Sequence, residues 1–304
     1  MRLAPKDFVR SPEALAASYS LSDAQAYARW LATSHYENFH VASFFLPRRL
    51  HQDFFNVYSF CRWADDLGDE IGGTQESLRL LAWWREQLQA MYRGECSHPV
   101  FVALRGTVDR HGIPIEPLND LILAFEQDQV VTRYRTWEDL FDYCRRSANP
   151  VGRLVLYLCG YQDPERRRLS DSTCTALQLA NFWQDVGVDL EKNRIYLPLE
   201  TLDRHGSSVE EVQARRATPA FRAALREAVD RAEELFREGL PLARMLSPRL
   251  SLDIALFSRG GMLVLEKIRR QDYDVFALRP YISKGERFRL LLRTLVEVAV
   301  ARAA

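Results

Sequence analysis

The sequence lacks paired cysteines, an excess of charge of one sign, and long apolar runs. Its five cysteines are isolated, without a Cys-x-x-Cys pair, which argues against a disulfide framework or a zinc site. Lysine plus arginine and aspartate plus glutamate both number 41, so no basic excess is present to bind nucleic acid. No segment reaches the ~20 apolar residues of a membrane-spanning helix, and residues 1–10 lack the apolar core of a signal peptide. We therefore expect a cytoplasmic protein with no nucleic-acid partner.

Strand patterns and glycine-rich nucleotide motifs are also missing. Apolar residues recur almost everywhere with the period of an α-helix, and no low-complexity linker or internal repeat divides the chain. With 304 residues, 47% of them hydrophobic, the chain can bury a large core. The sequence thus predicts one all-α domain, residues 1–304. The predicted helices are Asp23–Phe45, Leu50–Gly68, Glu76–Tyr92, Glu116–Val131, Trp137–Ala148, Val151–Tyr161, Asp171–Leu190, Pro219–Met245, Ser251–Arg270 and Lys284–Arg302.

An unusual polar pattern occupies residues 58–70. If this segment is helical, Tyr58, Arg62, Asp65 and Asp69 fall on one stripe. Two aspartates four residues apart repel each other by a few tenths of a kcal/mol in an isolated helix. One such pair is typical of a solvated helix face. A second pair in similar surroundings would favour a functional explanation.

That second copy lies in residues 178–189, where Gln178, Asn181, Asp185 and Asp189 share a predicted stripe. The segment around it is too apolar and aromatic for a typical surface helix, so the stripe is expected to line a cavity or a partner helix. Carboxylate oxygens used sparingly suit Mg²⁺, which is typically shared with the phosphates of a substrate. Two facing aspartate pairs would therefore hold a diphosphate.

The following loop, residues 192–198, ends the predicted helix beside this site. Its side chains Lys192, Arg194 and Tyr196 are candidate phosphate contacts, because cationic and hydroxyl donors bind phosphate oxygens well. The alternative is that the loop is only a helix exit marked by Pro198. The sequence leaves both explanations open.

Together these segments resemble the two aspartate-rich motifs and the following loop of the squalene and phytoene synthases, the head-to-head prenyl transferases. Residues 35–39 are similar to the motif that opens the first conserved helix of that family, and the likeness runs from about Asp23 to Asp274. The order and spacing of the motifs are more specific than either aspartate pair alone. The resemblance implies a single helical bundle of the isoprenoid synthase type with a central cavity.

The resemblance also assigns roles to individual residues. It implies Mg²⁺ as the cofactor and a prenyl diphosphate as the substrate. The catalytic group comprises Arg62 and the four metal-binding aspartates, Asp65, Asp69, Asp185 and Asp189. The substrate-binding group comprises His35, Asn38, Tyr58, Gln178, Asn181, Arg194, Tyr196 and Tyr273. Asp66 is expected to lie just outside the metal ligands.

Within the family, residues 35–39, 147–154 and 181–185 are most similar to the bacterial hydroxysqualene synthases of the hopanoid pathway. This branch would convert presqualene diphosphate to hydroxysqualene and inorganic diphosphate. Condensing members usually carry a tyrosine and a glycine where this chain has Arg146 and Asn149, and often an arginine where it has Gln184. The missing positive charge at Gln184 suits an enzyme that handles one diphosphate rather than two.

The same resemblance suggests how the cation is handled. A carbocation is attracted to aromatic ring faces by ~0.5–2 kcal/mol each when desolvated, and the candidate rings are Phe39, Phe44, Tyr58, Phe182 and Trp183. If Pro150 lies inside a helix, it leaves the carbonyl of Arg146 without its backbone donor. That carbonyl, the amide of Asn149 and the hydroxyl of Ser147 could then hold one water. The alternative is a kink that only shapes packing.

Three other functions are compatible with parts of the sequence. One is a condensing synthase that makes presqualene diphosphate, dehydrosqualene or phytoene. Another is a ferritin-like metal protein, which requires Glu-x-x-His on two helices; Glu37 with His40 has this spacing, whereas Glu95 with His98 falls in a predicted loop. The third is an inactive helical scaffold. The resemblance also allows peripheral association with the inner face of the membrane and contact with other squalene-pathway enzymes.

Overall fold

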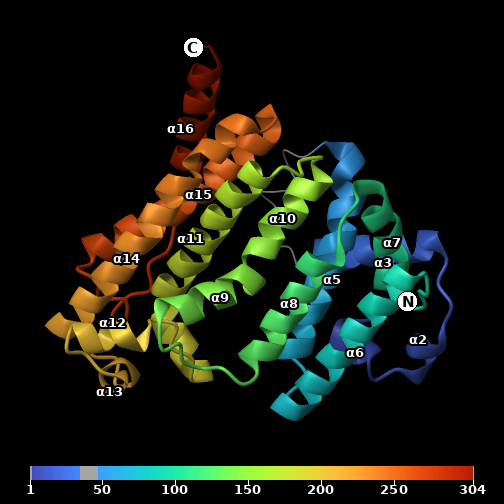
Figure 1. Ribbon diagram of the computed structural model, residues 1–304, viewed down its shortest axis with the longest axis horizontal. Coiled ribbons are helices and arrows are strands. Elements are labelled where there is room, and N and C mark those ends of the chain that lie inside the picture. Colours follow the sequence, from blue (N-terminus) through green and yellow to red (C-terminus); the bar gives the residue numbers. More distant parts are fainter. Residues whose placement is uncertain (1, 35–46, 304) are drawn as a thin grey trace. The chain divides into compact units, whose positions relative to one another are not determined.

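The computed structural model describes residues 2–34 and 47–303. Across these ranges the secondary structure is helical apart from an isolated bridge between Arg133 and Ile195, which confirms the all-α prediction (Figure 1). The chain forms two compact units. The first comprises residues 1–130 and 150–163, and the second comprises residues 131–149 and 164–304.

The first unit contains the helices that precede residue 130 and most of one later helix. They are α1 (Pro5–Phe8), α2 (Pro12–Ala16), α3 (Leu21–Ser34), η1 (Arg48–Leu50), α5 (His51–Asp69), α6 (Thr74–Arg93), α7 (Pro99–His111), α8 (Ile115–Asp128) and α10 (Asn149–Leu158). Aromatic rings form the core behind α5. Trp63 of α5 stacks on Trp84 of α6, with ring centroids 4.9 Å apart, and the ring of His98 meets Trp63 edge-on at 4.4 Å.

Buried polar groups fix α5 against α7. Asn56 donates to the carbonyl of Ala103 and to the hydroxyl of Thr107, both at 3.0 Å. The carboxylate of Asp53, which is 3% exposed, accepts from Thr107 at 2.8 Å and also contacts Arg110 and His111. Because buried polar atoms need specific partners, these contacts set the position of α5 along α7.

The second unit is built around α11 (Pro164–Asp189), which packs against α14 (Pro219–Gly239) and α15 (Pro248–Arg270) (Figure 1). A Cβ atom at Gly261 of α15 would overlap the ring of Phe236 of α14, so glycine is needed for this close approach. The remaining elements of this unit are α9 (Trp137–Ser147), η2 (Leu190–Lys192), α12 (Leu199–Arg204), α13 (Val209–Gln213), η3 (Leu240–Met245) and α16 (Lys284–Ala303).

Most differences from the predicted helices occur at their ends. α11 begins at Pro164 rather than Asp171, and α15 begins at Pro248 rather than Ser251, since proline is favoured in the first turn. α14 ends at Gly239, and residues 240–245 form a 3₁₀ helix. The predicted helix from Asp23 is observed as α3 up to Ser34; its remainder lies outside the described residues.

One long helix, α7, is absent from the prediction. Its apolar run includes β-branched valines and Gly106, which are weak helix formers and obscure the helical signal. Its ends nevertheless have favourable residues, with Pro99 in the first turn and Gly112 left-handed at φ 61° after the last turn. No described helix is long and apolar enough to cross a bilayer.

Candidate active site

The first polar stripe lies on α5 and is centred on Arg62. This guanidinium contacts Asp65 at 3.4 Å and Glu70 at 3.0 Å, and it forms a shorter ion pair with Asp66. The side chain of Asp65 is 45% exposed and Asp69 is exposed, whereas Trp63 is fully buried on the other side of α5. The predicted stripe is therefore the solvent-accessible side of the helix.

Asp66 differs from the neighbouring aspartates because it is only 2% exposed. Burial raises the pKa of its carboxyl to about 7, although the Arg62 charge acts in the opposite direction. Asp66 thus fixes the position of the Arg62 guanidinium through an ion pair on the buried side, while Asp65 and Asp69 remain accessible. This is compatible with the expectation that Asp66 lies outside the metal ligands.

The second polar stripe lies on α11. Gln178, Asp185 and Asp189 are half-buried and Asn181 is exposed, so all four share an accessible face. Trp183 is fully buried and donates its indole N–H to the carbonyl of Ala228 at 3.0 Å. It belongs to the core of the second unit, and the suggestion that its ring faces a cation is therefore not supported. The helical period separates these two groups of side chains.

Asp185 has a partner that sequence reasoning missed. Arg279 donates from Nε to Oδ1 of Asp185 at 2.5 Å and from Nη2 to Oδ2 at 3.1 Å, a two-point contact. Next to it, Gln184 donates to the carbonyl of Pro280 at 2.5 Å. Arg279 is 94 residues away from Asp185 in the sequence, so no local spacing indicates this pair.

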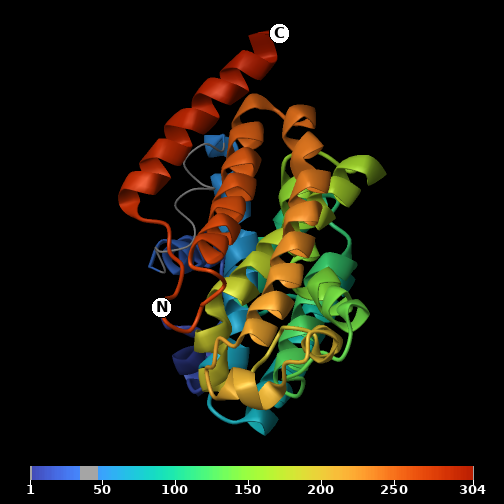
Figure 2. The same cartoon turned by 90° about the vertical axis from the view of Figure 1, so that its left-hand side faces the viewer.

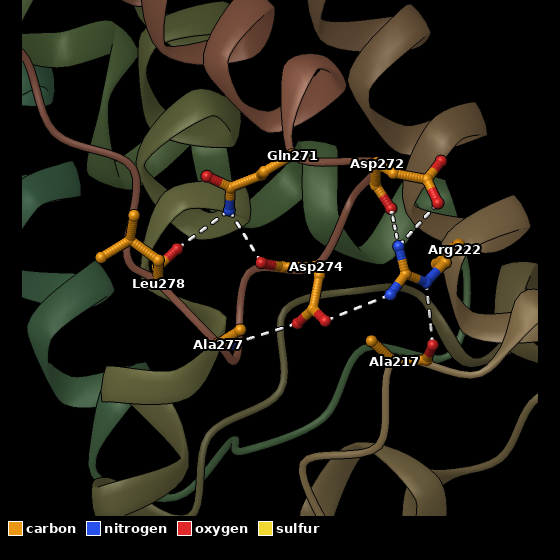
Figure 3. Close-up of polar contacts among 7 residues, drawn as sticks. All are labelled: Ala217, Arg222, Gln271, Asp272, Asp274, Ala277 and Leu278. Carbon is orange, nitrogen blue, oxygen red and sulfur yellow. Dashed lines mark hydrogen bonds and ion pairs between the residues drawn. The ribbon is translucent and has the colours of Figure 1, made fainter.

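The loop that carries Arg279 is hydrogen-bonded to Arg222 near the start of α14 (Figure 3). Arg222 donates to the backbone carbonyl and the carboxylate of Asp272 at 2.5 and 2.7 Å, and to the carboxylate of Asp274 at 3.1 Å. Gln271 donates to the carbonyls of Asp274 and Leu278 at 2.8 and 2.9 Å. This network orders the chain immediately before Arg279, so that its guanidinium is held beside Asp185.

The loop after the second aspartate pair carries an aromatic cluster. Tyr196 stacks on Phe182 with ring centroids 3.7 Å apart and an interplanar angle of 7°, and it lies 6.0 Å from Tyr143. Backbone bonds fix the loop, since Arg194 N–H donates to the carbonyl of Asp189 at 2.9 Å. Phe182 and Tyr196 are thus held together next to the accessible face of α11.

Polar side chains gather at the end of α9 and the first residue of α10. The hydroxyl of Thr175 on α11 donates to Oδ1 of Asn149 at 2.8 Å. Oγ of Ser147 is buried and has no hydrogen-bond partner within the described ranges. The side chain of Arg146 turns back to Asp142. Pro150 lies in the first turn of α10 rather than inside one continuous helix, because α9 ends at Ser147.

Of three further predicted substrate-binding residues, the structure describes only Tyr273. Tyr273 follows α15 in a left-handed conformation, φ 60°, and its buried ring lies 5.1 Å below the guanidinium carbon of Arg226. His35 and Asn38 lie outside the described residues, as do the aromatic candidates Phe39 and Phe44 and the pair Glu37 with His40. His98, from the other Glu-x-x-His pair, is a buried cap of α7 whose pKa is lowered to about 3 by burial.

The carboxylates fit a divalent cation that is shared with a ligand. Among the described residues, no group of three or more acidic, histidine or cysteine side chains could hold a metal alone. Within its own unit each aspartate pair is accessible, and at Asp185 a guanidinium already neutralises the carboxylate. Such a site suits a cation that takes few protein ligands and keeps several waters or phosphate oxygens. Mg²⁺ is a cation of this kind.

Comparisons with known proteins agree with this geometry. Residues 32–286 match the family model described as squalene/phytoene synthase. A phytoene synthase of Thermus thermophilus is 33% identical over 85% of this chain and 88% of its own, and a hydroxysqualene synthase of Rhodopseudomonas palustris is 34% identical over 78% and 80%. The crystal structure of squalene synthase HpnC from Alicyclobacillus acidocaldarius has a TM-score of 0.80 and 47% identity, covering 83% of this chain and 95% of that one.

These matches confirm the resemblance found in the motifs and extend it beyond them. The family model spans both units, and the bundle has the helical fold of the solved relative. The chain therefore belongs to the squalene/phytoene synthase family of head-to-head prenyl transferases.

Proposed function

We propose that the protein is a hydroxysqualene synthase. It ionises presqualene diphosphate, and one water captures the resulting cation. The carbon–oxygen bond to the diphosphate breaks, a new carbon–oxygen bond forms to water, and the water loses one proton to the released diphosphate or to solvent. No reductant is needed, because the carbon skeleton gains a hydroxyl rather than a hydride.

Ionisation depends on stabilising the departing diphosphate. We assign Asp65, Asp69, Asp185 and Asp189 as Mg²⁺ ligands, which is supported by their accessibility and by the chemistry of paired carboxylates. When bound, Mg²⁺ neutralises the charge that develops on the leaving group. Arg62 is held by Asp66 in a fixed position, so its remaining donors are preorganised for a phosphate oxygen.

Arg279 supplies a second guanidinium that can stabilise the departing diphosphate. In the structure it neutralises Asp185. The Arg279 guanidinium carries five N–H donors in a planar fork, and those that do not bind Asp185 would be available to the diphosphate. This extends the set of anion-binding side chains beyond Lys192, Arg194 and Tyr196.

Water capture is supported by one observation in particular, the partnerless Oγ of Ser147. A buried hydroxyl without a partner costs roughly 1–3 kcal/mol, and a bound water would remove that cost. Asn149, which is fixed by Thr175, lies two residues further along and provides a second polar group. The stacked rings of Phe182 and Tyr196 supply aromatic surface in the same unit that can face a carbocation.

A condensing synthase is the second candidate, since the phytoene synthase relative is as similar to this chain as the hydroxysqualene synthase relative. Arg146 and Asn149 favour the first candidate, because they stand where condensing members usually have tyrosine and glycine. We further propose that the bundle acts as one domain and that the protein works in the cytoplasm, at the inner face of the membrane, with other squalene-pathway enzymes as neighbours.

The experiment compares two substrates. Purified protein with Mg²⁺ receives presqualene diphosphate or farnesyl diphosphate separately, without a reduced nicotinamide, and the products are identified by mass spectrometry. We expect an alcohol from presqualene diphosphate and little turnover of farnesyl diphosphate. Formation of presqualene diphosphate, dehydrosqualene or phytoene from shorter precursors would instead support the condensing synthase.

A further inference from the structure

The last helix, α16, carries an apolar stripe on its outer side. Phe288, Leu292, Leu295 and Val296 recur at the spacing of one helix face, and their exposed fractions are 60%, 48%, 42% and 63%. Together they are called here the α16 apolar face. Large exposed side chains gathered in this way differ from the isolated exposed apolar residues that are normal on protein surfaces.

Basic residues border the α16 apolar face on both sides. On the helix, Lys284 and Arg287 precede one edge of the stripe, while Arg289 and Arg293 lie along the other. No ion pair involves Lys284, Arg287 or Arg289 in the portion of the chain that the structure describes. The surface therefore combines apolar side chains with uncompensated positive charge.

The acidic residues of α16 are turned toward the rest of the second unit. Glu286 pairs with Lys267 of α15 at 2.7 Å and accepts from Ser283, and Glu297 pairs with Arg259 of α15. Thr294 lies between them on this inner side and is fully buried. The helix thus has one face that packs against α15 and an opposite face that is apolar in the middle and basic at the edges.

α16 is an outer helix of its unit, next to α15 (Figure 2). It begins directly after the loop that Arg222 (Figure 3) and Asp185 contact. Almost all of α16 also lies beyond residues 32–286, the part that matches the family model. Its outer face is therefore a feature of this chain that the shared catalytic core does not explain.

We propose that the α16 apolar face binds the surface of a lipid bilayer that contains anionic lipids. The helix lies in the plane of the interface, with its apolar stripe among the acyl chains and its basic borders at the headgroups. No described helix could span the bilayer, so the contact is peripheral. The inference deepens the proposed function, on which it rests in part, because a C30 prenyl diphosphate reaches the enzyme from such a surface.

A second copy of the chain fits this face less well than a bilayer does. In a symmetric dimer the two stripes would meet and the basic borders of both copies would lie close together. Like charges at an interface disfavour association. Anionic headgroups, in contrast, complement Lys284, Arg287 and Arg289, whereas Arg293 already pairs with Glu297 at 2.8 Å.

The test is sedimentation of the full-length protein with phosphatidylcholine vesicles, with or without about one third phosphatidylglycerol. We expect binding to the anionic vesicles, release at high salt, and weak binding to the neutral ones. Replacing the stripe with Phe288→Ser, Leu292→Ser and Val296→Ser should weaken binding at least about tenfold. Arg287→Gln with Arg289→Gln should weaken it about fivefold for each charge, on anionic vesicles only.

The matched control is Leu15→Ser with Val130→Ser, which removes exposed apolar side chains from the first unit and should leave vesicle binding unchanged. Circular dichroism confirms folding of each variant. Unchanged binding of the stripe variant, or a wild-type dimer in solution that this variant dissociates, would overturn the proposal. Vesicle binding is measured without substrate, so the membrane proposal can be correct even if presqualene diphosphate is not turned over. If the stripe substitutions remove only the membrane contact, turnover in detergent should survive them.

Discussion

At the level of single residues, the charged groups differ most in how much stability the protein loses when their ion-pair partner is exchanged. The Arg279 side chain is 54% exposed and the Asp185 side chain 26% exposed, so their ion pair is partly exposed to water. Such pairs contribute roughly 0–1 kcal/mol to stability. Asp185 can therefore exchange its guanidinium for a metal at little cost to the fold, which is what a ligand-binding carboxylate requires.

The variant Asp185→Asn tests this separation of activity from stability. We expect turnover at saturating Mg²⁺ to fall at least about 100-fold, because a charge that stabilises the leaving group is removed. The free energy of unfolding should change by less than about 1 kcal/mol. Asp109→Asn is the matched control, since Asp109 is likewise paired with an arginine, Arg105, at 2.8 Å, and is exposed. Near-normal turnover of Asp185→Asn would contradict the metal-ligand assignment.

Asp253 on α15 is the opposite case, a carboxyl that is 2% exposed and has no hydrogen-bond partner among the described residues. Burial raises its pKa to about 7. The folded protein therefore binds more protons than the unfolded chain between about pH 4 and pH 7, so this residue's contribution to stability is lost as the pH rises through that range.

Asp253→Asn should remove this pH dependence. Between pH 5 and pH 8 the unfolding free energy of the wild type should fall relative to the variant by on the order of 2 kcal/mol, as measured by urea denaturation. Asp66, whose pKa is also raised by burial, contributes to both proteins and cancels in this difference. The exposed Asp203→Asn variant should track the wild type. Parallel curves for Asp253→Asn and wild type would show that the carboxyl is ionised in the fold.

At the same scale, local spacing predicted the two aspartate pairs because helical periodicity alone places them on common faces. It could not predict Arg279 or the loop held by Arg222, since these contacts join segments that are far apart in the sequence. Nor could it distinguish Phe182 from Trp183, two adjacent buried rings, of which one stacks on Tyr196 and the other donates to a carbonyl of α14.

At the level of helices, α5 depends on its buried contacts with α7. Burial alone would raise the pKa of Asp53, but hydrogen bonds from His111, Thr107 and Arg110 outweigh it and lower the pKa below its ordinary value. The stability that these bonds contribute is present at neutral pH and is lost as the pH falls through the lowered pKa. Asp53 thus has the opposite pH dependence from Asp253.

Removing the carboxylate by Asp53→Ala should lower the unfolding free energy by about 3 kcal/mol, because Thr107 and the charged partners lose a buried acceptor. Chemical denaturation at neutral pH measures the loss. Asp109→Ala, one turn along α7 from Arg105, should cost less than about 1 kcal/mol. If both variants lose the same stability, the buried network does not fix α5.

Helix interiors were predictable from sequence where apolar residues keep a regular period, as in α5, α6 and α14. Helix ends were less so, because Pro164 and Pro248 are compatible with either a break or a first turn. The interruption at Pro241 and the whole of α7 depend on packing, which overrides weak local preference.

At the level of the whole molecule, the chain passes from one unit to the other three times, after residues 130, 149 and 163. Each unit carries one aspartate pair on a long helix, and a single family match covers both. The sequence predicted this fold class and this family from motif order. The sequence predicts one domain, and no linker or change in composition marks residues 130, 149 or 163, where the chain passes between the two compact units.

The central claim is that solvent supplies the oxygen of the product. The most direct measurement uses purified protein, Mg²⁺ and presqualene diphosphate in water enriched in oxygen-18, without a reduced nicotinamide, with mass spectrometry of the product. Water capture of the cation predicts an alcohol that carries the heavy isotope in proportion to its enrichment in the solvent. An unlabelled alcohol, a hydrocarbon, or no product from presqualene diphosphate would contradict the claim.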